Sequence, residues 1–168
     1  ENNYGVSLLN DCKYGYNIKD NVMKLSLLRS PKRPDPTADM GTHDFTYALL
    51  PHTGIVTEGD TIQEGAALNL PLQYFEGKAK DSGKAIVRLS DPSLYLDAVK
   101  RAEDGDGYVI RVHECRGGAH EVQLTSDYGI KRFAPCNLLE EKTGEIEEGG
   151  TISFGIKPFE IRSYRVWF

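Results

Sequence analysis

The chain has 168 residues, of which 39% are hydrophobic and 10% aromatic, and its formal net charge is −5. A chain of this length can bury a core as one ordinary domain or two small ones, and this composition is typical of folded proteins and not of disordered ones. Because its lysines and arginines are scattered among acids, the chain lacks a clustered positive field, and we expect no nucleic-acid partner.

Alternation of apolar and polar residues predicts β-strands along most of the chain. In chain order, the expected strands cover residues 22–28, 43–50, 108–115, 120–126 and 160–168. A period of two places one set of side chains against a core and the other set in water. The sets expected to share a face are Met23 with Leu25 and Leu27, Phe45 with Tyr47 and Leu49, Tyr108 with Ile110 and Val112, Val122 with Leu124, and Tyr164 with Val166 and Phe168.

The residues between these segments predict turns and at most one short helix. The pair Gly117-Gly118 separates two expected strands, so we expect a β-hairpin there. The stretch 55–68 is rich in Glu, Gln and Ala, which favours a short helix or an ordered loop, although Gly59 and Gly65 weaken a helix. Many short strands separated by turns are typical of an all-β fold, and we expect an antiparallel β-sandwich.

The polar segment 76–84 contains glycine and has no periodicity, so we expect a loop or linker there. It would separate a first portion, residues 1–75, which carries a long proline-rich loop, from a C-terminal β-sheet portion, residues 85–168. The two portions can also form one domain.

The cysteines and the apolar runs bear on the compartment. Cys12, Cys115 and Cys136 are odd in number and far apart, which argues against a disulfide framework and for a reducing compartment. Their spacing also lacks the close Cys pairs of zinc sites. No apolar run approaches the length of a membrane span, and residues 1–20 lack the layout of a signal peptide. We therefore expect a cytoplasmic location and no membrane partner.

A long loop, residues 29–43, separates two of the expected strands and contains three prolines. Loops of this length in compact domains are usually functional or disordered. Asp39, His43 and Asp44 lie near its end, with His52 after the next strand, and a zinc site would need three or four such groups to converge. Strand alternation sends Asp44 to the face opposite His43. The favoured interpretation is that Asp39 stabilises a turn and His43 opens a strand.

A second group of polar residues flanks the expected hairpin. His113, Glu114 and Cys115 are adjacent, and His120 follows the glycine pair, so the two histidines would approach each other across a hairpin. Neighbours on one strand point to opposite faces, which favours a surface hairpin without a site. The sequence also lacks a Gly-x-Ser-x-Gly elbow, a convincing pair of glycosidase carboxylates and a phosphate-binding glycine loop.

Aromatic residues allow one further interpretation from composition. Tyr14, Tyr16, Tyr47, Tyr74 and Trp167 can stack on sugar rings if they are exposed. Tyrosines in strands more often pack against the core or the sheet, and that alternative is favoured. Residue patterns alone therefore lead to a β-sandwich of unknown task.

The opening stretch carries a resemblance. "GVSLLNDCKYGYNI" (5–18) and "LSLLRSPKRPDPTADMGTHDFTYALLPHTG" (25–54) resemble the C-terminal β-rich region of glycoside hydrolase family 38 α-mannosidases. The pieces that continue the resemblance in the family's order are "GAALNLPL" (65–72), "VIRVHECRGG" (109–118), "CNLLEE" (136–141) and "IKPFEIRSYRV" (156–166). In the first of these, Ala67 stands where the family has an acidic residue. The block from Arg-Ser-Pro to Pro-His is the specific part.

The resemblance implies the final, non-catalytic portion of a zinc-dependent retaining α-mannosidase that hydrolyses terminal α-mannosidic bonds. The zinc ion and the aspartate nucleophile of the family sit in an N-terminal barrel, and no position of this chain corresponds to them. The implied partners are that barrel and, through it, mannose-containing oligosaccharides. A portion without its barrel is expected to expose an apolar patch and to self-associate.

The resemblance also suggests a role for the loop at 29–43. Prolines lower the entropy lost when a loop is ordered, so the loop can project stiffly towards an active-site mouth. It would then present Arg29, Asp39 or His43 to a sugar, with Tyr14 as a further candidate near the substrate, and Arg29 is favoured because a guanidinium suits hydroxyls and carboxylates. Docking of the sandwich to the barrel is the alternative for this loop. An independent carbohydrate-binding module and a purely structural sandwich are the alternatives for the chain.

Overall fold

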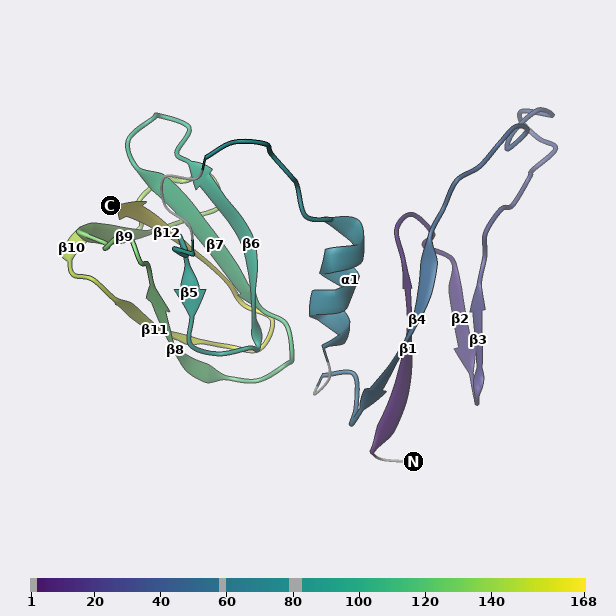
Figure 1. Cartoon of the computed structure of the whole chain (residues 1–168), viewed down its shortest axis with the longest axis horizontal. Helices are drawn as coiled ribbons and strands as arrows, with labels where there is room; N and C mark the ends of the chain where they lie inside the picture. The colour runs from purple at the N-terminus through teal and green to yellow at the C-terminus, as the bar shows by residue number, and fades with distance from the viewer. Residues whose placement is uncertain (1–2, 58–59, 79–82) are drawn as a thin grey trace. The chain divides into compact units, whose positions relative to one another are not determined.

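The computed structural model describes residues 3–57, 60–78 and 83–168, which divide into unit 1 (Glu1–Tyr74) and unit 2 (Phe75–Phe168) (Figure 1). The elements of unit 1 are β1 (Tyr4–Asn10), β2 (Tyr16–Lys19), β3 (Val22–Leu25), β4 (Tyr47–Thr53) and α1 (Thr61–Asn69). Those of unit 2 are β5 (Arg88–Leu89), β6 (Leu94–Arg101), β7 (Tyr108–Glu114), β8 (His120–Thr125), β9 (Arg132–Cys136), β10 (Glu147–Glu148), β11 (Ile152–Ile156) and β12 (Ile161–Trp167).

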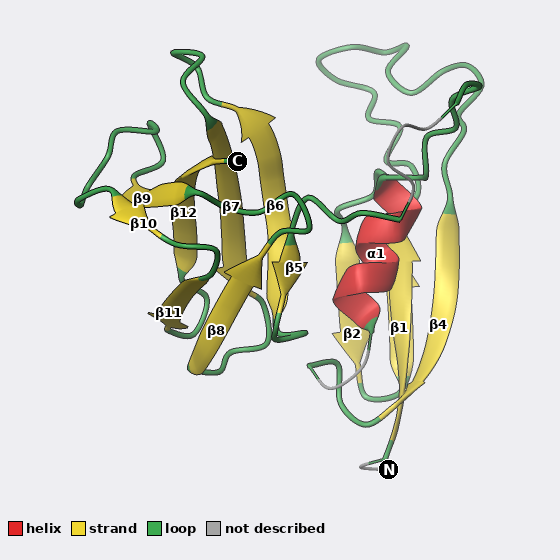
Figure 2. Ribbon diagram, turned by 60° about the vertical axis from the view of Figure 1, so that its left-hand side comes forward, coloured by secondary structure: helices red, strands yellow, loops and turns green. Residues whose placement is uncertain are grey.

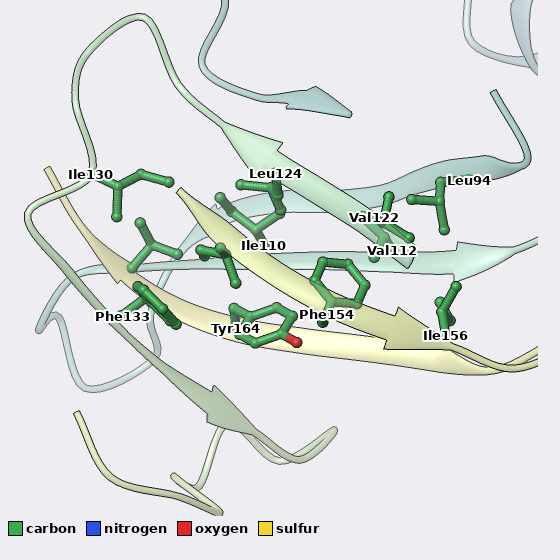
Figure 3. Packing of buried hydrophobic residues seen from close by; sticks show 12 residues of the cluster. Leu94, Ile110, Val112, Val122, Leu124, Ile130, Phe133, Phe154, Ile156 and Tyr164 are labelled. Carbon is green, nitrogen blue, oxygen red and sulfur yellow. The ribbon is translucent and has the colours of Figure 1, made fainter. Parts of the chain in front are cut away.

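Unit 2 is a β-sandwich made of two antiparallel sheets (Figure 2). The larger sheet has the strand order β10-β9-β12-β7-β6, and the smaller has the order β11-β8-β5. Figure 3 shows the apolar side chains that both sheets contribute to one core. The buried members are Leu94, Ile110, Val112, Val122, Leu124, Ile130, Phe133, Ile152, Phe154, Ile156, Tyr164 and Val166. The prediction of an all-β antiparallel sandwich with at most one short helix is confirmed.

Strand periodicity correctly placed six of the twelve buried core side chains of unit 2, those on β7, β8 and β12. Val122 and Leu124 on β8 are buried together, as are Tyr164 and Val166 on β12. The exception is Tyr108, which opens β7 and stays exposed at the end of the sandwich. The alternation on β7 and β12 is incomplete because residues on the other face are buried as well: Val109 packs with Ala102 and Cys136, and Arg165 and Trp167 are almost fully buried.

The prediction of a hairpin at Gly117-Gly118 is wrong. β7 pairs with β6 and β12, whereas β8 pairs with β5 and β11 in the other sheet. The glycine pair therefore lies in a connection that carries the chain from one sheet to the other. Its backbone is held by Glu114, whose carboxylate accepts the N–H groups of Arg116 and Gly117, both at 2.8 Å. Gly117 has φ +82°, which glycine adopts without the steric cost of a Cβ.

Unit 1 pairs β1 with β4 and forms a hairpin from β2 and β3. Helix α1 packs on one face of the β1–β4 ribbon, where the hydroxyls of Ser7 and Thr61 are 2.8 Å apart. The helix occupies the later part of the stretch 55–68 predicted for it, and Gly59 lies outside the described residues. No helix of the described residues is long and apolar enough to cross a membrane.

The strands of unit 1 are shorter or shifted compared with their predictions. The strand expected at 43–50 begins only at Tyr47, and its Tyr47 and Leu49 are exposed while Ala48 and Leu50 are half-buried. The expected core face is therefore the outer one, because α1 covers the opposite face. On the described residues of unit 1 no side chain is fully buried. Met23, Leu25 and Leu27 do share a face, and with Leu8 and Tyr47 they line a shallow depression of about 210 Å³.

The segment 76–84, predicted to be a loop or linker, falls after the first unit. Its described residues, 76–78 with 83 and 84, form no regular element, and residues 79–82 lie outside the described part of the chain.

Candidate functional site

The long loop between β3 and β4 (residues 26–46), called here the 26–46 loop, extends beyond the ends of these strands (Figure 1). Both of its ends are tied to the turn that joins β1 to β2. The N–H of Ser26 donates to the carbonyl of Gly15 at 2.8 Å. At the other end, the N–H of Thr46 donates to the Asp11 carboxylate at 3.0 Å, and the N–H of Asp11 donates to the Thr46 carbonyl at 3.2 Å. Tyr14 lies in the same turn and is therefore brought to the base of this loop.

Aspartates organise the interior of the 26–46 loop. The Asp35 carboxylate accepts the N–H of Thr37 at 2.9 Å and its hydroxyl at 2.8 Å, and these bonds lower the pKa of Asp35. The Asp39 carboxylate accepts the N–H of Ser30 at 2.7 Å, which links two points nine residues apart. The ring Nε2 of His43 lies 2.9 Å from the carbonyl oxygen of Asp39. Internal hydrogen bonds of this kind give the loop a defined conformation.

The four residues predicted to lie near a substrate occupy this region, with different roles. Asp39 and His43 are brought together, and both are used in bonds that shape the loop. Arg29 is exposed and has no hydrogen-bond or ion-pair partner within the described ranges, and it directly precedes the residue that Asp39 holds. Tyr14 is 90% exposed. The guanidinium of Arg29 and the ring of Tyr14 are thus presented outwards from a braced backbone.

The residues weighed as metal ligands do not assemble. His52 bonds instead to Ser7 on the neighbouring strand, with Nε2 3.1 Å from the hydroxyl. Across the described residues, no three His, Cys, Asp or Glu side chains form a group that can hold a metal ion. Cys12 is exposed, Cys115 and Cys136 are buried, and burial raises the pKa of both buried thiols.

The sequence patterns did not reveal the role of Glu114, whose side chain is fully buried at 0% exposed. Besides the two N–H groups of the turn after β7, its carboxylate accepts the N–H of Phe159 at 2.9 Å. Burial alone raises the pKa of Glu114, but the backbone donors outweigh burial and hold that pKa below its usual value. The expectation of a surface hairpin at this position is therefore wrong. The segment Arg111–Gly117 instead stabilises the fold through the hydrogen bonds of a buried carboxylate. In the same segment, Arg111 Nε donates to the hydroxyl of Ser163 at 3.0 Å.

The histidines near this turn are not brought together across a hairpin, since β7 and β8 do not pair. His113 Nδ1 lies 2.9 Å from a carboxylate oxygen of Asp97. His120 Nδ1 lies 3.1 Å from a carboxylate oxygen of Asp91, and its Nε2 lies 3.8 Å from the buried carboxylate of Glu114. Each ring therefore has its own carboxylate, and the arrangement does not form a catalytic pair.

A second buried charge holds the turn before β7. Arg165, on β12, is 5% exposed and pairs with the carboxylate of Asp104. Its Nε donates to the carbonyl of Asp106 at 2.9 Å, and the indole N–H of Trp167 donates to the Asp106 carboxylate at 2.8 Å. Gly107, with φ +85°, leaves room for the indole, because a Cβ there would lie 2.8 Å from the Trp167 nitrogen. In the sequence, this turn is visible as the acid-glycine repeat from Asp104 to Gly107. The repeat predicts a turn but not the contacts with Arg165 and Trp167.

The aromatic residues considered for sugar stacking differ in their exposure to solvent. Tyr14, Tyr16, Tyr47 and Tyr74 are exposed on unit 1, and Trp167 is almost fully buried in unit 2. Unit 2 also has a depression of about 430 Å³, called here the aromatic depression, which sequence patterns did not predict. Its lining residues are Ile86, Gly107, Tyr108, Tyr128, Trp167 and Phe168.

Comparison with known proteins agrees with the sequence resemblance. The family described as "Glycosyl hydrolases family 38 C-terminal beta sandwich domain" matches residues 93–164, and the "Glycosyl hydrolases family 38 C-terminal domain" matches residues 1–37. The chain is 39% identical to "Alpha-mannosidase G" of Dictyostelium discoideum, over 98% of the chain and 16% of that protein. It is 37% identical to "Alpha-mannosidase 2C1" of Mus musculus, over 97% of the chain and 16% of that protein.

A third relative is the "Alpha-mannosidase" of Saccharomyces cerevisiae, which is 37% identical over 98% of the chain and 17% of that protein. The chain thus spans only 16% to 17% of the length of these curated relatives while nearly all of its own residues take part in the match.

Proposed function

The chain belongs to the C-terminal region of glycosyl hydrolase family 38, and from this we propose that it is the non-catalytic end of an α-mannosidase, supporting a catalytic barrel and its active-site rim. The observation that carries the proposal is that 97% to 98% of the chain aligns with α-mannosidases that are about six times as long. The parent enzyme would hydrolyse terminal α-mannosidic bonds of oligosaccharides with retention, in the cytoplasm.

Zinc belongs to the catalytic part in this proposal and not to these residues. A catalytic zinc site needs three protein ligands that converge, and the described residues offer no such group. In this proposal the ligands and the nucleophile lie in the catalytic barrel of the parent enzyme, and no catalytic step is assigned to this chain.

The surface of unit 1 supports the idea that it packs against further protein. Its described residues bury no side chain completely, and many of its large apolar side chains are exposed. The most exposed of them are Tyr14, Met40, Leu70, Leu72, Tyr74 and Ile18. Exposed apolar surface on this scale favours contact with a partner surface, which is the barrel in the parent enzyme. Without the barrel, the same surface favours self-association of the chain.

The 26–46 loop has a specific place in the proposal. Asp39 fixes the backbone next to Arg29 by accepting the Ser30 N–H, and His43 in turn contacts the Asp39 carbonyl. Arg29 is thus the residue that reaches the sugar or a catalytic carboxylate, Tyr14 adds a ring at the base of the loop, and Asp39 and His43 are positioning residues. If the loop docks to the barrel instead, Arg29 contacts protein and not substrate.

Hydrolysis of an aryl α-mannoside tests the proposal. The full-length enzyme, the enzyme truncated before this region, and the isolated 168-residue chain are assayed with and without added zinc. We expect turnover by the full-length enzyme, none by the isolated chain, and recovery of the truncated enzyme's activity when the chain is added in trans. Turnover by the isolated chain would place the catalytic site within these residues and contradict the proposal. An inert full-length enzyme would instead favour a carbohydrate-binding or purely structural module.

A further inference from the structure

We propose that the aromatic depression of unit 2 is a second, non-catalytic carbohydrate site that binds a pyranose ring, with mannose as its preferred sugar. The choice of mannose rests on the proposed function; the choice of a sugar rests on the depression itself. At about 430 Å³ the depression falls within the range of small-ligand pockets and is large enough for one or two sugar residues.

Two tyrosines provide the accessible rings of this site. Tyr108 and Tyr128 are each 44% exposed. The ring of Tyr108 packs on that of Phe168, with centroids 5.5 Å apart and an interplanar angle of 58°, and this contact supports its orientation. The ammonium of Lys84 lies 5.4 Å from the centroid of the Tyr128 ring. Each residue therefore offers an exposed aromatic surface together with a hydroxyl group.

Several contacts hold the indole of Trp167, which lines the aromatic depression, in one position. The indole of Trp167 donates to Asp106 at 2.8 Å, and the guanidinium carbon of Arg132 lies 4.6 Å from the centroid of the indole ring system. Gly107 brings the backbone against the indole at a distance that any Cβ would prevent. A site held in this way loses little conformational entropy when a ligand enters it, which favours binding of small ligands.

The chemistry of the depression favours a neutral polyhydroxylated ring. A pyranose has an apolar C–H face that packs on an aromatic ring and a rim of hydroxyls that need hydrogen-bond partners. The hydroxyls of Tyr108 and Tyr128 offer such partners around an otherwise apolar lining. The cations near the lining are already engaged: Lys84 and Arg132 lie over aromatic rings, and the Lys131 ammonium donates to the Phe168 carbonyl at 3.1 Å. These contacts leave the cations less available to an anionic ligand, and a purely apolar ligand would cover the tyrosine hydroxyls without pairing them.

Trp167 provides a direct test, because it is the single tryptophan of the chain. The 168-residue chain is titrated with α-mannobiose while the intrinsic fluorescence is recorded. We expect a saturable change of the Trp167 emission. Removing one ring by Tyr108→Ala or Tyr128→Ala should weaken binding roughly 2- to 12-fold, the range that a single aromatic contact provides. Tyr4→Ala is the matched control, since Tyr4 is an exposed tyrosine of unit 1 and should leave the titration unchanged.

Circular dichroism and urea unfolding of each variant separate loss of binding from loss of fold. Tyr128→Phe is the conservative variant, because it keeps the aromatic ring and removes only the hydroxyl. If the Trp167 emission shows no saturable change with mannobiose up to about 100 mM, the inference is overturned. So would binding of an apolar dye at the depression that the sugar does not displace, which would identify a packing surface. Equal titrations with methyl α-glucoside and methyl α-mannoside would overturn the preference for mannose. None of these results bears on hydrolysis by the full-length enzyme, so the two proposals fail separately.

Discussion

The carboxylate of Glu114 accepts the backbone N–H of Phe159 at 2.9 Å, although the two residues are 45 positions apart. This bond joins the end of β7 to the turn that precedes β12, and β7 and β12 are paired in the larger sheet. The same carboxylate holds the N–H groups of Arg116 and Gly117. One buried side chain therefore stabilises both the crossing between the two sheets and the entry to β12.

Replacing Glu114 by glutamine should lower the free energy of unfolding by about 1–3 kcal/mol. An amide oxygen accepts fewer hydrogen bonds than a carboxylate, and its NH₂ group would face backbone donors in a buried site. Urea unfolding followed by circular dichroism measures the change. Glu121→Gln is the matched control, because Glu121 is exposed on β8, and it should unfold as the unchanged chain does. Equal midpoints for the two variants would contradict the role assigned to Glu114.

Replacing Gly107 by alanine should destabilise unit 2 by about 1–3 kcal/mol, since it combines a φ of +85° with a Cβ 2.8 Å from the Trp167 nitrogen and the Val166 carbonyl oxygen. The Trp167 emission should shift as well, because the indole must move. Thermal unfolding and fluorescence report the two effects. Gly150→Ala serves for comparison, as a Cβ there meets nothing within 4 Å and its φ is not positive. If both alanines are tolerated alike, the close packing at Gly107 does not stabilise the fold.

Unit 2 should become less stable in acid, because protonation of Asp127 removes its ion pair with Arg88. Hydrogen bonds from Arg88 and then from the N–H of Ala85 lower the pKa of Asp127 from 3.8 to about 2. Because the folded-state pKa is the lower one, the stabilisation is fully present above pH 3.8 and disappears as the pH falls through about 2. Arg88→Gln should raise the pKa of Asp127 towards its ordinary value, which an NMR titration of the carboxyl carbon measures.

Lys84→Gln is the control for this titration, since Lys84 contributes less than Arg88 to the lowering. A larger shift in Lys84→Gln than in Arg88→Gln would refute the assignment of the lowered pKa to the Arg88 pair.

Replacing Arg29 by alanine in the full-length enzyme should lower kcat/KM for mannosides roughly 10- to 150-fold, the value of one hydrogen bond to a charged group. The free energy of unfolding should stay the same, because Arg29 is exposed and has no partner among residues 3–57, 60–78 and 83–168. Lys32→Ala, in the same loop, is the matched change of an exposed cation and should leave the kinetics unaltered. Unchanged kinetics for Arg29→Ala would favour the docking role of the loop.

How far the fold follows from the sequence depends on whether an element is local. Alternation on β8 and β12 identified their buried faces, since one strand's pattern needs no knowledge of its partner. The glycine pair at 117 and 118 was interpreted as a hairpin, but the same turn residues also serve a connection between sheets. Sheet partners decide between the two, and they come from distant parts of the chain. The strands β6 and β9 had no clear alternation and were not predicted.

The candidate site shows the same division. The prolines and the Arg-Ser-Pro block drew attention to the loop and to Arg29, yet the bond from Ser30 to Asp39 that braces Arg29 became visible only in the structure. The aromatic depression had no sequence signal at all, since Tyr108, Tyr128 and Phe168 come from separate segments.

The sequence by itself determined the all-β class, the faces of several strands and the family resemblance, because these depend on residue order over short stretches. Only the tertiary structure decided which strands pair, that Glu114 and Arg165 are buried, and that aromatic rings converge at one end of unit 2. The reason is physical: burial and long-range hydrogen bonds, such as the one from Arg165 to Asp106 across 59 positions, are properties of chain segments brought together by folding. No spacing within one segment encodes them.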